Sequence, residues 1–452
     1  MMADDTVEGV LARFASGFPQ SEMPASSVRH ARWLLIDAVG CALAGDLARE
    51  TSAVTEAAAA TFGGGVSTVI GSQQQLSAAG ATMLNAYRMT AMTVCDVYRP
   101  AHCHITPLVI PAALAASDEA AVSGRDFLAA VIVGMEMTTR IAVGLDYPAF
   151  RARGWHSPGV VGPLGSAAAV GRIGRFDEAT MRHALGLAAT QSAGSYLSWG
   201  TPAVKFHQAR GAVSGLLAAR LAEQGFPGGQ QPLTAPDGGV YNTHSNGGDP
   251  VKALADLGVR WELEQIALRL WPGASPVQAM LTATFDMIAS EGARADNVAS
   301  VMVGVSTEDF ATHARFARPR GTFEALLSYA YLCSAALHDQ VVWFEQVEHP
   351  RFEDPTLLAF AEERISLAPV DDIPVNGCQL EVEFADGRRR SRRVEAARGT
   401  PENPPAEEEI RAKFHLCADR KLGHGRAHTL LETLTDIESC EDMALVCEMM
   451  RG

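Results

Sequence analysis

Residues 123–143 read Ser-Gly-Arg-Asp-Phe-Leu-Ala-Ala-Val-Ile-Val-Gly-Met-Glu-Met-Thr-Thr-Arg-Ile-Ala-Val, and this stretch indicates the fold class. Ser123 precedes a predicted helix over 127–143, in the way that capping residues precede helices. Apolar residues occupy several sides of this segment, which is typical of a helix buried among other helices. Glu136 and Arg140 stand at i,i+4, so we expect a structural ion pair; the alternative is that Arg140 reaches a substrate.

Similar segments continue to about residue 295. Ser26 and Ser27 are expected to cap a helix that runs through 28–37, and Ala/Leu-rich segments over 178–191 and 211–224 predict two further helices. The abundance of Ala and Gly permits close packing between helices. This part of the chain therefore predicts a large all-helical bundle.

The pattern changes near residue 295. Residues 297–305 alternate apolar and small residues and predict a strand, and residues 378–388 predict a hairpin that turns at Asp386-Gly387. A helix is expected over 323–337, and residues 399–405 interrupt the chain before a final helical segment. We therefore predict a mainly α protein: a helical domain of 1–274 and 400–452, and a smaller α+β lid domain of 275–399.

Composition excludes several classes of partner. The chain has 452 residues, 47% hydrophobic and 20% charged, with a formal net charge of −15, so it offers no broad basic face for nucleic acid or an anionic membrane. A small anionic substrate remains compatible, because a pocket can be positive inside an acidic protein. The acidic start, the absence of a signal sequence and eight cysteines without a CxxC pair predict a cytoplasmic protein with reduced thiols.

Histidines gather in three short segments that are marked by Gly and Pro. They are His102 and His104 in residues 100–107, His156 in residues 154–159, and His207 in residues 205–211, where Lys205 stands two residues earlier. Imidazoles with an ammonium group suit the binding of an anion and proton transfer near neutral pH. The alternative for each histidine alone is a capping or surface role.

Other chemistries have weaker support. His102-x-His104 with Asp96 and Cys95 offers ligands for zinc or iron, but no further ligand follows at a regular spacing. Gly63-Gly64-Gly65 lacks the lysine and the helix context of a nucleotide site, and no Gly-x-Ser-x-Gly motif indicates a serine hydrolase. We therefore expect no metal.

The ordered set of motifs resembles the MmgE/PrpD family over nearly the whole chain. These motifs are Leu84-Asn85-Ala86, Val109-Ile110-Pro111-Ala112, Gly154-Trp155-His156, Lys205-Phe206-His207, Gly225-Phe226-Pro227-Gly228, Trp271-Pro272, Ser328-Tyr329-Ala330-Tyr331, Asp386-Gly387 and Pro401-Glu402-Asn403-Pro404 before Lys413-Phe414. The resemblance implies a helical domain with an α+β lid, a homodimer, no metal or organic cofactor, and a site between the two domains.

The resemblance also implies site residues. His104, His156 and Lys205 match the family's two histidines and its lysine, and Tyr331 matches its tyrosine. The Lys-Phe-His spacing is one residue shorter than the family's, so the role of His207 is left undecided between a catalytic and a structural one. Because imidazoles titrate near neutral pH, we expect His104 and His156 to serve as general acid and base, in an order the sequence leaves open.

Several departures from the family pattern concern the pocket. Only Asp96 remains of an acidic cluster, Tyr98 stands where a small hydroxyl residue is usual, Arg269 replaces a lysine, and Gln278 replaces a histidine. We expect Lys205 and Arg269 to hold substrate carboxylates, and His207 and Gln278 to belong to the binding site. Asp96 either orients an imidazole or satisfies a loop backbone, Tyr98 narrows the pocket, and Tyr331 either donates to the substrate or packs in the core.

These residues favour a cofactor-independent lyase that acts on a small di- or tricarboxylate through a carbanion, by dehydration or decarboxylation. Cations and hydrogen-bond donors in a dry site stabilise the charge that develops in such a reaction. An epimerase or isomerase of a dicarboxylate on the same site is the first alternative. A carboxylate-binding relative without catalysis is the second, because one fold serves many functions.

Overall fold

The computed structural model describes residues 6–452, which form two compact units. The larger unit comprises the described residues up to Ala267 together with Glu407–Gly452, and the smaller unit is Leu268–Ala406. The sequence placed the boundaries a few residues later at the first junction and earlier at the second. The backbone N–H of Leu268 donates to the carbonyl of Gly399 at 2.9 Å, which ties both boundary segments to the smaller unit.

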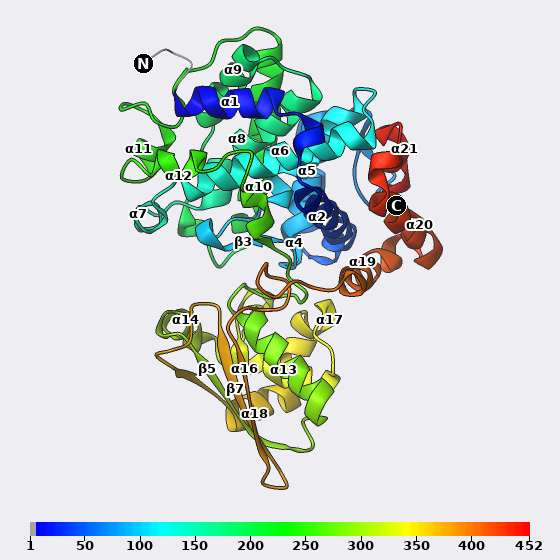
Figure 1. Ribbon diagram of the computed structural model, residues 1–452. Coiled ribbons are helices and arrows are strands. Elements are labelled where there is room, and N and C mark those ends of the chain that lie inside the picture. Colours follow the sequence, from blue (N-terminus) through cyan, green and yellow to red (C-terminus); the bar gives the residue numbers. More distant parts are fainter. Residues whose placement is uncertain (1–5) are drawn as a thin grey trace. The chain divides into compact units, whose positions relative to one another are not determined.

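The larger unit is helical, and α8 lies at its centre, packed against α5, α6 and α10 (Figure 1). Over the described residues, no helix has the length and apolar character needed to cross a membrane. Its helices are α1 (Val7–Gly17), α2 (Ala25–Ala44), α3 (Thr51–Phe62), α4 (Ala78–Ala91), α5 (Thr106–Asp118), α6 (Gly124–Val143), α7 (Tyr147–Ala152), α8 (Ser157–Ile173), α9 (Glu178–Ala189), α10 (Ala203–Glu223), α11 (Val240–His244), α12 (Pro250–Leu254), α19 (Glu407–Leu422), α20 (His424–Thr435) and α21 (Met443–Met449).

Helix α6 confirms the structural interpretation of Glu136 and Arg140. The Ser123 hydroxyl accepts from the N–H of Asp126 at 3.1 Å and caps the helix. Arg140 Nε donates to Glu136, and both side chains are fully buried. The same carboxylate accepts the N–H groups of Glu262 (3.0 Å) and Leu263 (2.8 Å), so the pair holds a loop of the larger unit in place.

Several predicted helix limits were wrong; α6, for example, begins at Gly124 and not at Phe127. Helix α2 begins before Ser26, and the Ser27 hydroxyl donates to Glu264 at 2.7 Å instead of capping the helix. Helix α10 begins at Ala203, so Lys205 and His207 lie in its first turns and not in a preceding loop. The helix expected over 323–337 is two helices, because Ser328 caps a new start by accepting from the N–H of Tyr331 at 3.1 Å.

The smaller unit is a four-stranded sheet with helices packed on it. The strand order is β6-β5-β7-β8, where β5 and β6 are parallel and the other pairs antiparallel. The hairpin predicted at Asp386-Gly387 is confirmed as β7 and β8, and Gly387 has a φ of 85°, which favours glycine. The elements are α13 (Val277–Glu291), β5 (Val298–Val305), α14 (Thr307–His313), α15 (Thr322–Ala325), α16 (Tyr329–Asp339), α17 (Phe344–Val347), α18 (Pro355–Arg364), β6 (Ile365–Pro369), β7 (Cys378–Phe384) and β8 (Arg389–Val394).

The C-terminal helices belong to the larger unit, as α19 packs against α2. A buried ion pair joins Lys413 of α19 to Asp37 of α2, and Lys413 also donates to the carbonyl of Val94 at 2.8 Å. Gly40 lets the helices approach closely, because a Cβ there would lie 3.2 Å from the Phe414 ring. The segment after the smaller unit is therefore anchored deep in the helical core.

Candidate functional site

His104 lies at the end of a short loop that is closed by its own backbone. The loop follows β3 (Val97–Tyr98), which pairs with β4 (Ile266–Ala267), and Tyr98 and Cys103 exchange backbone hydrogen bonds of 2.7 and 3.1 Å. The Nδ1 atom of His104 lies 2.7 Å from the backbone carbonyl oxygen of Asp96. Since a carbonyl only accepts, Nδ1 carries a proton, and Nε2 is the nitrogen that is left to exchange one.

The Asp96 side chain fixes the start of α5. It is fully buried and accepts from the N–H of Ile105 at 2.7 Å and from the N–H and hydroxyl of Thr106. Burial raises the pKa of Asp96, and the charge of His104 acts against that rise, so the two groups attract each other. The Asp96 carboxylate thus satisfies the loop backbone, as one interpretation of the sequence proposed, whereas the imidazole of His104 is held by the backbone carbonyl of Asp96 and not by its side chain.

His102 takes no part in this arrangement. It is exposed, has a φ of 44°, and stacks on Tyr147 with ring centroids 4.9 Å apart. The neighbouring histidines therefore face different partners, and the Asp96 carboxylate is engaged by backbone and hydroxyl donors. This geometry gives no support to a metal held by His102, His104 and Asp96.

His156 and His207 form a direct pair. His156 precedes α8, and its N–H donates to the carbonyl of Gly194 at 2.9 Å. Its Nδ1 lies 2.9 Å from Nδ1 of His207, which reaches it from α10. Gly194 makes room for the pair, because a Cβ there would lie 3.2 Å from His207 Nδ1. Across this contact one Nδ1 donates and the other accepts, so the two atoms share one proton.

Burial keeps this pair neutral. The pKa of His156 lies well below 6.5 because of burial, with smaller effects from the charges of His207, His104 and Arg151. Burial also lowers the pKa of His207. Both imidazoles are therefore uncharged near neutral pH, and an uncharged imidazole is a competent general base.

The loop of His104 and the start of α8 are joined through Ser157. Its hydroxyl lies 2.7 Å from the carbonyl oxygen of Ala101 and 3.1 Å from that of His102. The electrostatic effect of His104 on His156 agrees with this proximity. The structure therefore brings His104, His156 and His207 together in the larger unit. We call these three residues the buried histidine group after His156, which is buried, whereas His104 and His207 are partly exposed.

Lys205 lies on α10 two residues before His207. Residues two apart on a helix point roughly 200° apart, so the two side chains leave α10 in different directions. Lys205 is half-buried, and its ammonium group donates to the carbonyl of Ala91, the last residue of α4. In the sequence, the short Lys-Phe-His spacing left the role of His207 undecided. In the structure, Lys205 contacts α4 and His207 contacts His156.

Tyr98 is anchored away from the imidazoles by its hydroxyl. The ring is fully buried, and its OH donates to Glu262 at 2.6 Å. Burial, followed by the charge of Glu262, raises the pKa of Tyr98 far above its ordinary value. The structure thus gives Tyr98 a part in holding β3, and its effect on the size of a substrate stays a prediction.

Arg269 and Gln278 lie together in the smaller unit. Both are buried, and both donate to the carbonyl of Gly273, Arg269 at 3.0 Å and Gln278 at 3.4 Å. Gln278 also donates to the carbonyl of Trp271 at 3.0 Å. Among the residues that the structure describes, no group donates a hydrogen bond to Gln278 Oε1, although this oxygen is buried. This acceptor is free to receive a donor from a ligand.

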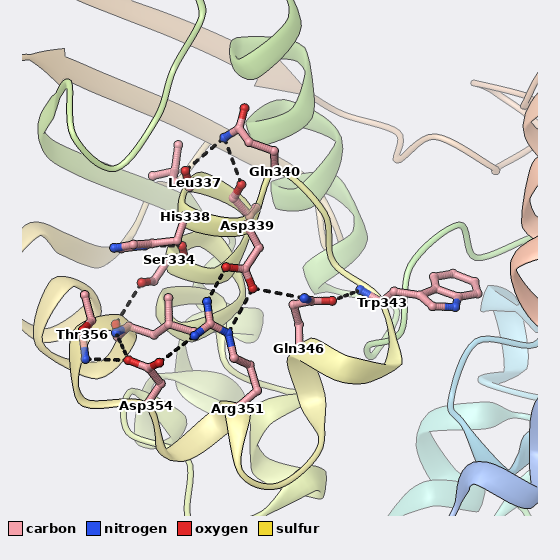
Figure 2. A network of polar contacts seen from close by, with 12 residues as sticks. Ser334, Leu337, His338, Asp339, Gln340, Trp343, Gln346, Arg351, Asp354 and Thr356 are labelled. Carbon is pink, nitrogen blue, oxygen red and sulfur yellow. Dashed lines mark hydrogen bonds and ion pairs between the residues drawn. The ribbon is translucent and has the colours of Figure 1, made fainter.

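Tyr331 lies in the core of the smaller unit beside a polar network. Figure 2 shows Asp339 between Gln346, which donates at 3.1 Å, and Arg351, which binds the carboxylate through two nitrogens. The hydroxyl of Tyr331 donates to the backbone carbonyl of Gln346, and burial raises its pKa. This surrounding matches the core-packing interpretation, and the catalytic role of Tyr331 stays a prediction.

Sequence reasoning missed the residues that surround His156. The guanidinium of Arg151 lies 3.2 Å from the ring centroid of Tyr196, whose ring meets His156 edge-on at 6.0 Å. The direct contact of His156 with His207 was also missed. Ser157-Pro158 is a local signal for a helix start that could have placed His156 at the N-terminus of α8. Nothing local marks Arg151 or Tyr196.

Comparisons with known proteins cover both units. The MmgE/PrpD N-terminal domain matches residues 9–252, and the MmgE/PrpD C-terminal domain matches residues 271–438. Cis-aconitate decarboxylase of Aspergillus terreus is 25% identical, over 99% of this chain and 96% of its own length. The cis-aconitate decarboxylase-like protein oryM of Aspergillus oryzae is 24% identical over 100% and 99%, and the human cis-aconitate decarboxylase 23% over 82% and 79%. Because the two domain matches together span most of the sequence, the chain belongs to the MmgE/PrpD family.

Proposed function

We propose that this chain is a lyase that removes CO2 from a small unsaturated tricarboxylate, with cis-aconitate as the first substrate to test. The relatives named above support the reaction class, at identities of 23–25%. The observation that carries the proposal is the buried histidine group. It joins two neutral imidazoles, which share a proton, to a third imidazole with a fixed tautomer.

The chemistry of such a substrate explains why this group is suitable. In cis-aconitate one carboxylate sits on the methylene carbon next to the double bond. When its C–C bond breaks, CO2 leaves, and the electron pair forms a new double bond to the former methylene carbon. The electrons of the old double bond move onto the carbon beside another carboxylate, as an enediolate. That carbon then takes a proton, so the step requires a positioned acid and groups that stabilise the developing charge.

We assign the proton transfer to the larger unit. His104 donates the proton from Nε2, because its Nδ1 is held by the carbonyl of Asp96 and the ring interacts with the Asp96 carboxylate. His156 stays neutral, donates or accepts a hydrogen bond, and exchanges its proton with His207. A low-polarity surrounding strengthens each of these interactions.

We assign carboxylate binding to cations. Lys205 presents an ammonium group at the start of α10, near the end of α4. In the smaller unit, Arg269 and Gln278 are the proposed binding groups, and the unpaired Gln278 Oε1 suits a protonated carboxyl or a hydroxyl donor. The homodimer that the family resemblance implies stays a prediction for a measurement of molar mass in solution.

The test is an NMR assay in deuterated water with a mixture of hydroxy-, unsaturated and amino-substituted di- and tricarboxylates. We expect consumption of cis-aconitate, release of CO2 and one deuteron on the product carbon that is protonated. His104→Ala and Lys205→Ala are expected to lose this activity. His102→Ala is the matched control, because His102 is exposed and faces Tyr147, and it is expected to keep the wild-type rate.

Full turnover in both His104→Ala and Lys205→Ala would contradict the assignment of residues. Loss or gain of water without CO2 release would replace decarboxylation by dehydration. Exchange of an α-proton with inversion would favour the epimerase. A carboxylate that raises the melting temperature, without any deuterium exchange, would favour the non-catalytic relative.

A further inference from the structure

A second group of histidines lies in the larger unit, on the two helices that follow the smaller unit. The sequence reads His415-x3-Asp419 on α19 and His424-x3-His428 on α20, with Gly423 at the turn between them. Residues four apart lie on the same face of a helix, so each helix presents a pair of side chains. We call these four residues the tail histidine cluster. Figure 1 labels its two helices near the C-terminus.

The side chains of this cluster converge across the turn. Asp419 lies 2.8 Å from Nδ1 of His415 through one carboxylate oxygen, and 2.8 Å from Nδ1 of His424 through the other. The rings of His415 and His424 are 4.8 Å apart, and the His428 ring lies 6.0 Å from His415 and 6.4 Å from His424. Two imidazoles and one carboxylate thus converge at the surface, and the His428 ring lies beside them.

The distances suit a metal ion. One donor atom from each of His415, Asp419 and His424 can be chosen so that all lie within 4.8 Å of one another. Tetrahedral zinc with Zn–N bonds of about 2.0 Å places its ligands ~3.3 Å apart, so the widest donor separation must close by about 1.5 Å. His424 is 75% exposed and has room to rotate, and the exposed His428 lies one turn further along α20.

The charge of the cluster also suits a cation. The two oxygens of the Asp419 carboxylate face imidazole nitrogens, one toward His415 and the other toward His424. A metal ion replaces the protons that now lie between Asp419 and the imidazoles.

We propose that the tail histidine cluster is a binding site for a late first-row divalent metal ion, of which Zn²⁺ is the probe. Imidazole nitrogens with one carboxylate are typical ligands of such ions, whereas Mg²⁺ and Ca²⁺ prefer sites made of oxygen atoms. The site is structural: it fastens α20 to α19. It is separate from the buried histidine group and independent of the function proposed above.

The position of α19 connects the proposed metal site to the core of the larger unit. Helix α19 carries Lys413, which pairs with Asp37 in the core and donates to the carbonyl of Val94. Val94 lies two residues before Asp96, whose carbonyl orients His104. A metal that orders the α19–α20 hairpin therefore stabilises a segment that reaches the larger unit's core, and we expect a higher melting temperature in its presence.

The experiment uses the full chain without an affinity tag, after treatment with a chelator. Calorimetric titration with ZnCl2 is expected to show one ion per chain with a dissociation constant on the order of 1 µM or lower. Titration with MgCl2 is the control for general cation binding and is expected to show none. Zinc is also expected to raise the melting temperature by several degrees.

Variants test the ligands. The His424 side chain is exposed, so its removal should leave the fold intact. His424→Ala is expected to weaken zinc binding by at least about tenfold. Asp419→Asn and His415→Ala are expected to do the same. His349→Ala, a control whose side chain is 70% exposed in the smaller unit, is expected to leave zinc binding unchanged. Absence of zinc binding to the wild-type chain, or zinc binding by His424→Ala and Asp419→Asn as tight as that of the wild type, would overturn the proposal.

Discussion

The larger unit contains two groups of three histidines, and their surroundings give them opposite chemistry. In the buried histidine group, His156 and His207 contact each other through Nδ1, and burial lowers the pKa of both. In the tail histidine cluster, His415 and His424 contact the carboxylate of Asp419 at the surface. The His156–His207 pair is kept neutral by burial; the tail histidine cluster is paired with an anion and reaches solvent.

This difference shows that the group in contact with an imidazole determines whether the imidazole is suited to proton transfer or to metal binding. A neutral imidazole held by a carbonyl or by another imidazole can take or give a proton at a defined nitrogen. An imidazole held by a surface carboxylate is oriented for metal binding and contributes little without the metal. The number of histidines and their spacing in the sequence do not separate these two cases.

The largest expected effect is on catalytic activity, and it distinguishes the buried histidine group from the tail histidine cluster. His104→Ala removes the proposed acid, so we expect kcat/KM for cis-aconitate to fall by about a hundredfold or more. His424→Ala changes an exposed side chain outside the proposed acid–base group, so we expect the wild-type rate in chelator-treated protein. Steady-state assays of both variants measure this. Similar losses in both would remove the distinction between the two groups.

Lys205 provides the next effect. A charged hydrogen bond to a carboxylate contributes about 1.5–3 kcal/mol, so Lys205→Ala is expected to reduce kcat/KM roughly 10- to 150-fold. Lys252→Ala, whose side chain is 65% exposed and pairs only weakly with Asp249, is the matched control. Equal kinetics in the two variants would contradict a role of Lys205 in binding the substrate.

Stability in acid tests the neutral state of the pair. The folded pKa of His156 and of His207 is below 6.5, so the unfolded chain binds more protons as the pH falls below about 6.5. The stability that these two histidines confer is fully present above pH 6.5 and is lost as the pH falls toward their pKa values in the folded protein. The free energy of unfolding falls by up to about 1.4 kcal/mol per pH unit for each histidine.

Urea unfolding between pH 7.5 and 5.5 measures this slope. His156→Gln is expected to make it shallower but not flat, because burial also lowers the pKa of His30, His244 and His313. An unchanged slope in His156→Gln would show that His156 does not contribute in the way proposed.

The smallest effect belongs to the tail histidine cluster without metal. Its contacts are partly exposed, so Asp419→Asn is expected to lower the free energy of unfolding by no more than about 1 kcal/mol, and less at high salt. With zinc present, the difference from the wild type is expected to grow. A large metal-free loss would mean that the cluster is a buried structural element and not an open metal site.

Local signals in the sequence predicted much of the fold. Ser123 precedes α6 as expected, although the helix begins three residues before the predicted start, and Asp386-Gly387 forms the turn of the β7–β8 hairpin. Both depend on hydrogen bonds or backbone angles within a few residues. The start of α10 was wrong, because the turn residues around Lys205 and His207 suggested a loop where tertiary packing extends the helix.

The candidate site was predictable in its residues but not in its contacts. His104, His156 and Lys205 came from the family resemblance, and their roles remain predictions. The contact of His156 with His207 joins residues 51 positions apart, which no local pattern encodes. The tail histidine cluster is the reverse case, since two pairs at i,i+4 around a glycine form a local signal that a search for histidine pairs would have found.

The neutral state of the His156–His207 pair is measured most directly by NMR of protein labelled with ¹⁵N in its histidine side chains. Variants His156→Gln and His207→Gln assign the signals. The account predicts that the His156 signals stay those of a neutral imidazole, with one protonated and one unprotonated nitrogen, as the pH is lowered through 6.5. A His156 that takes up a proton at or above pH 6.5 would contradict it.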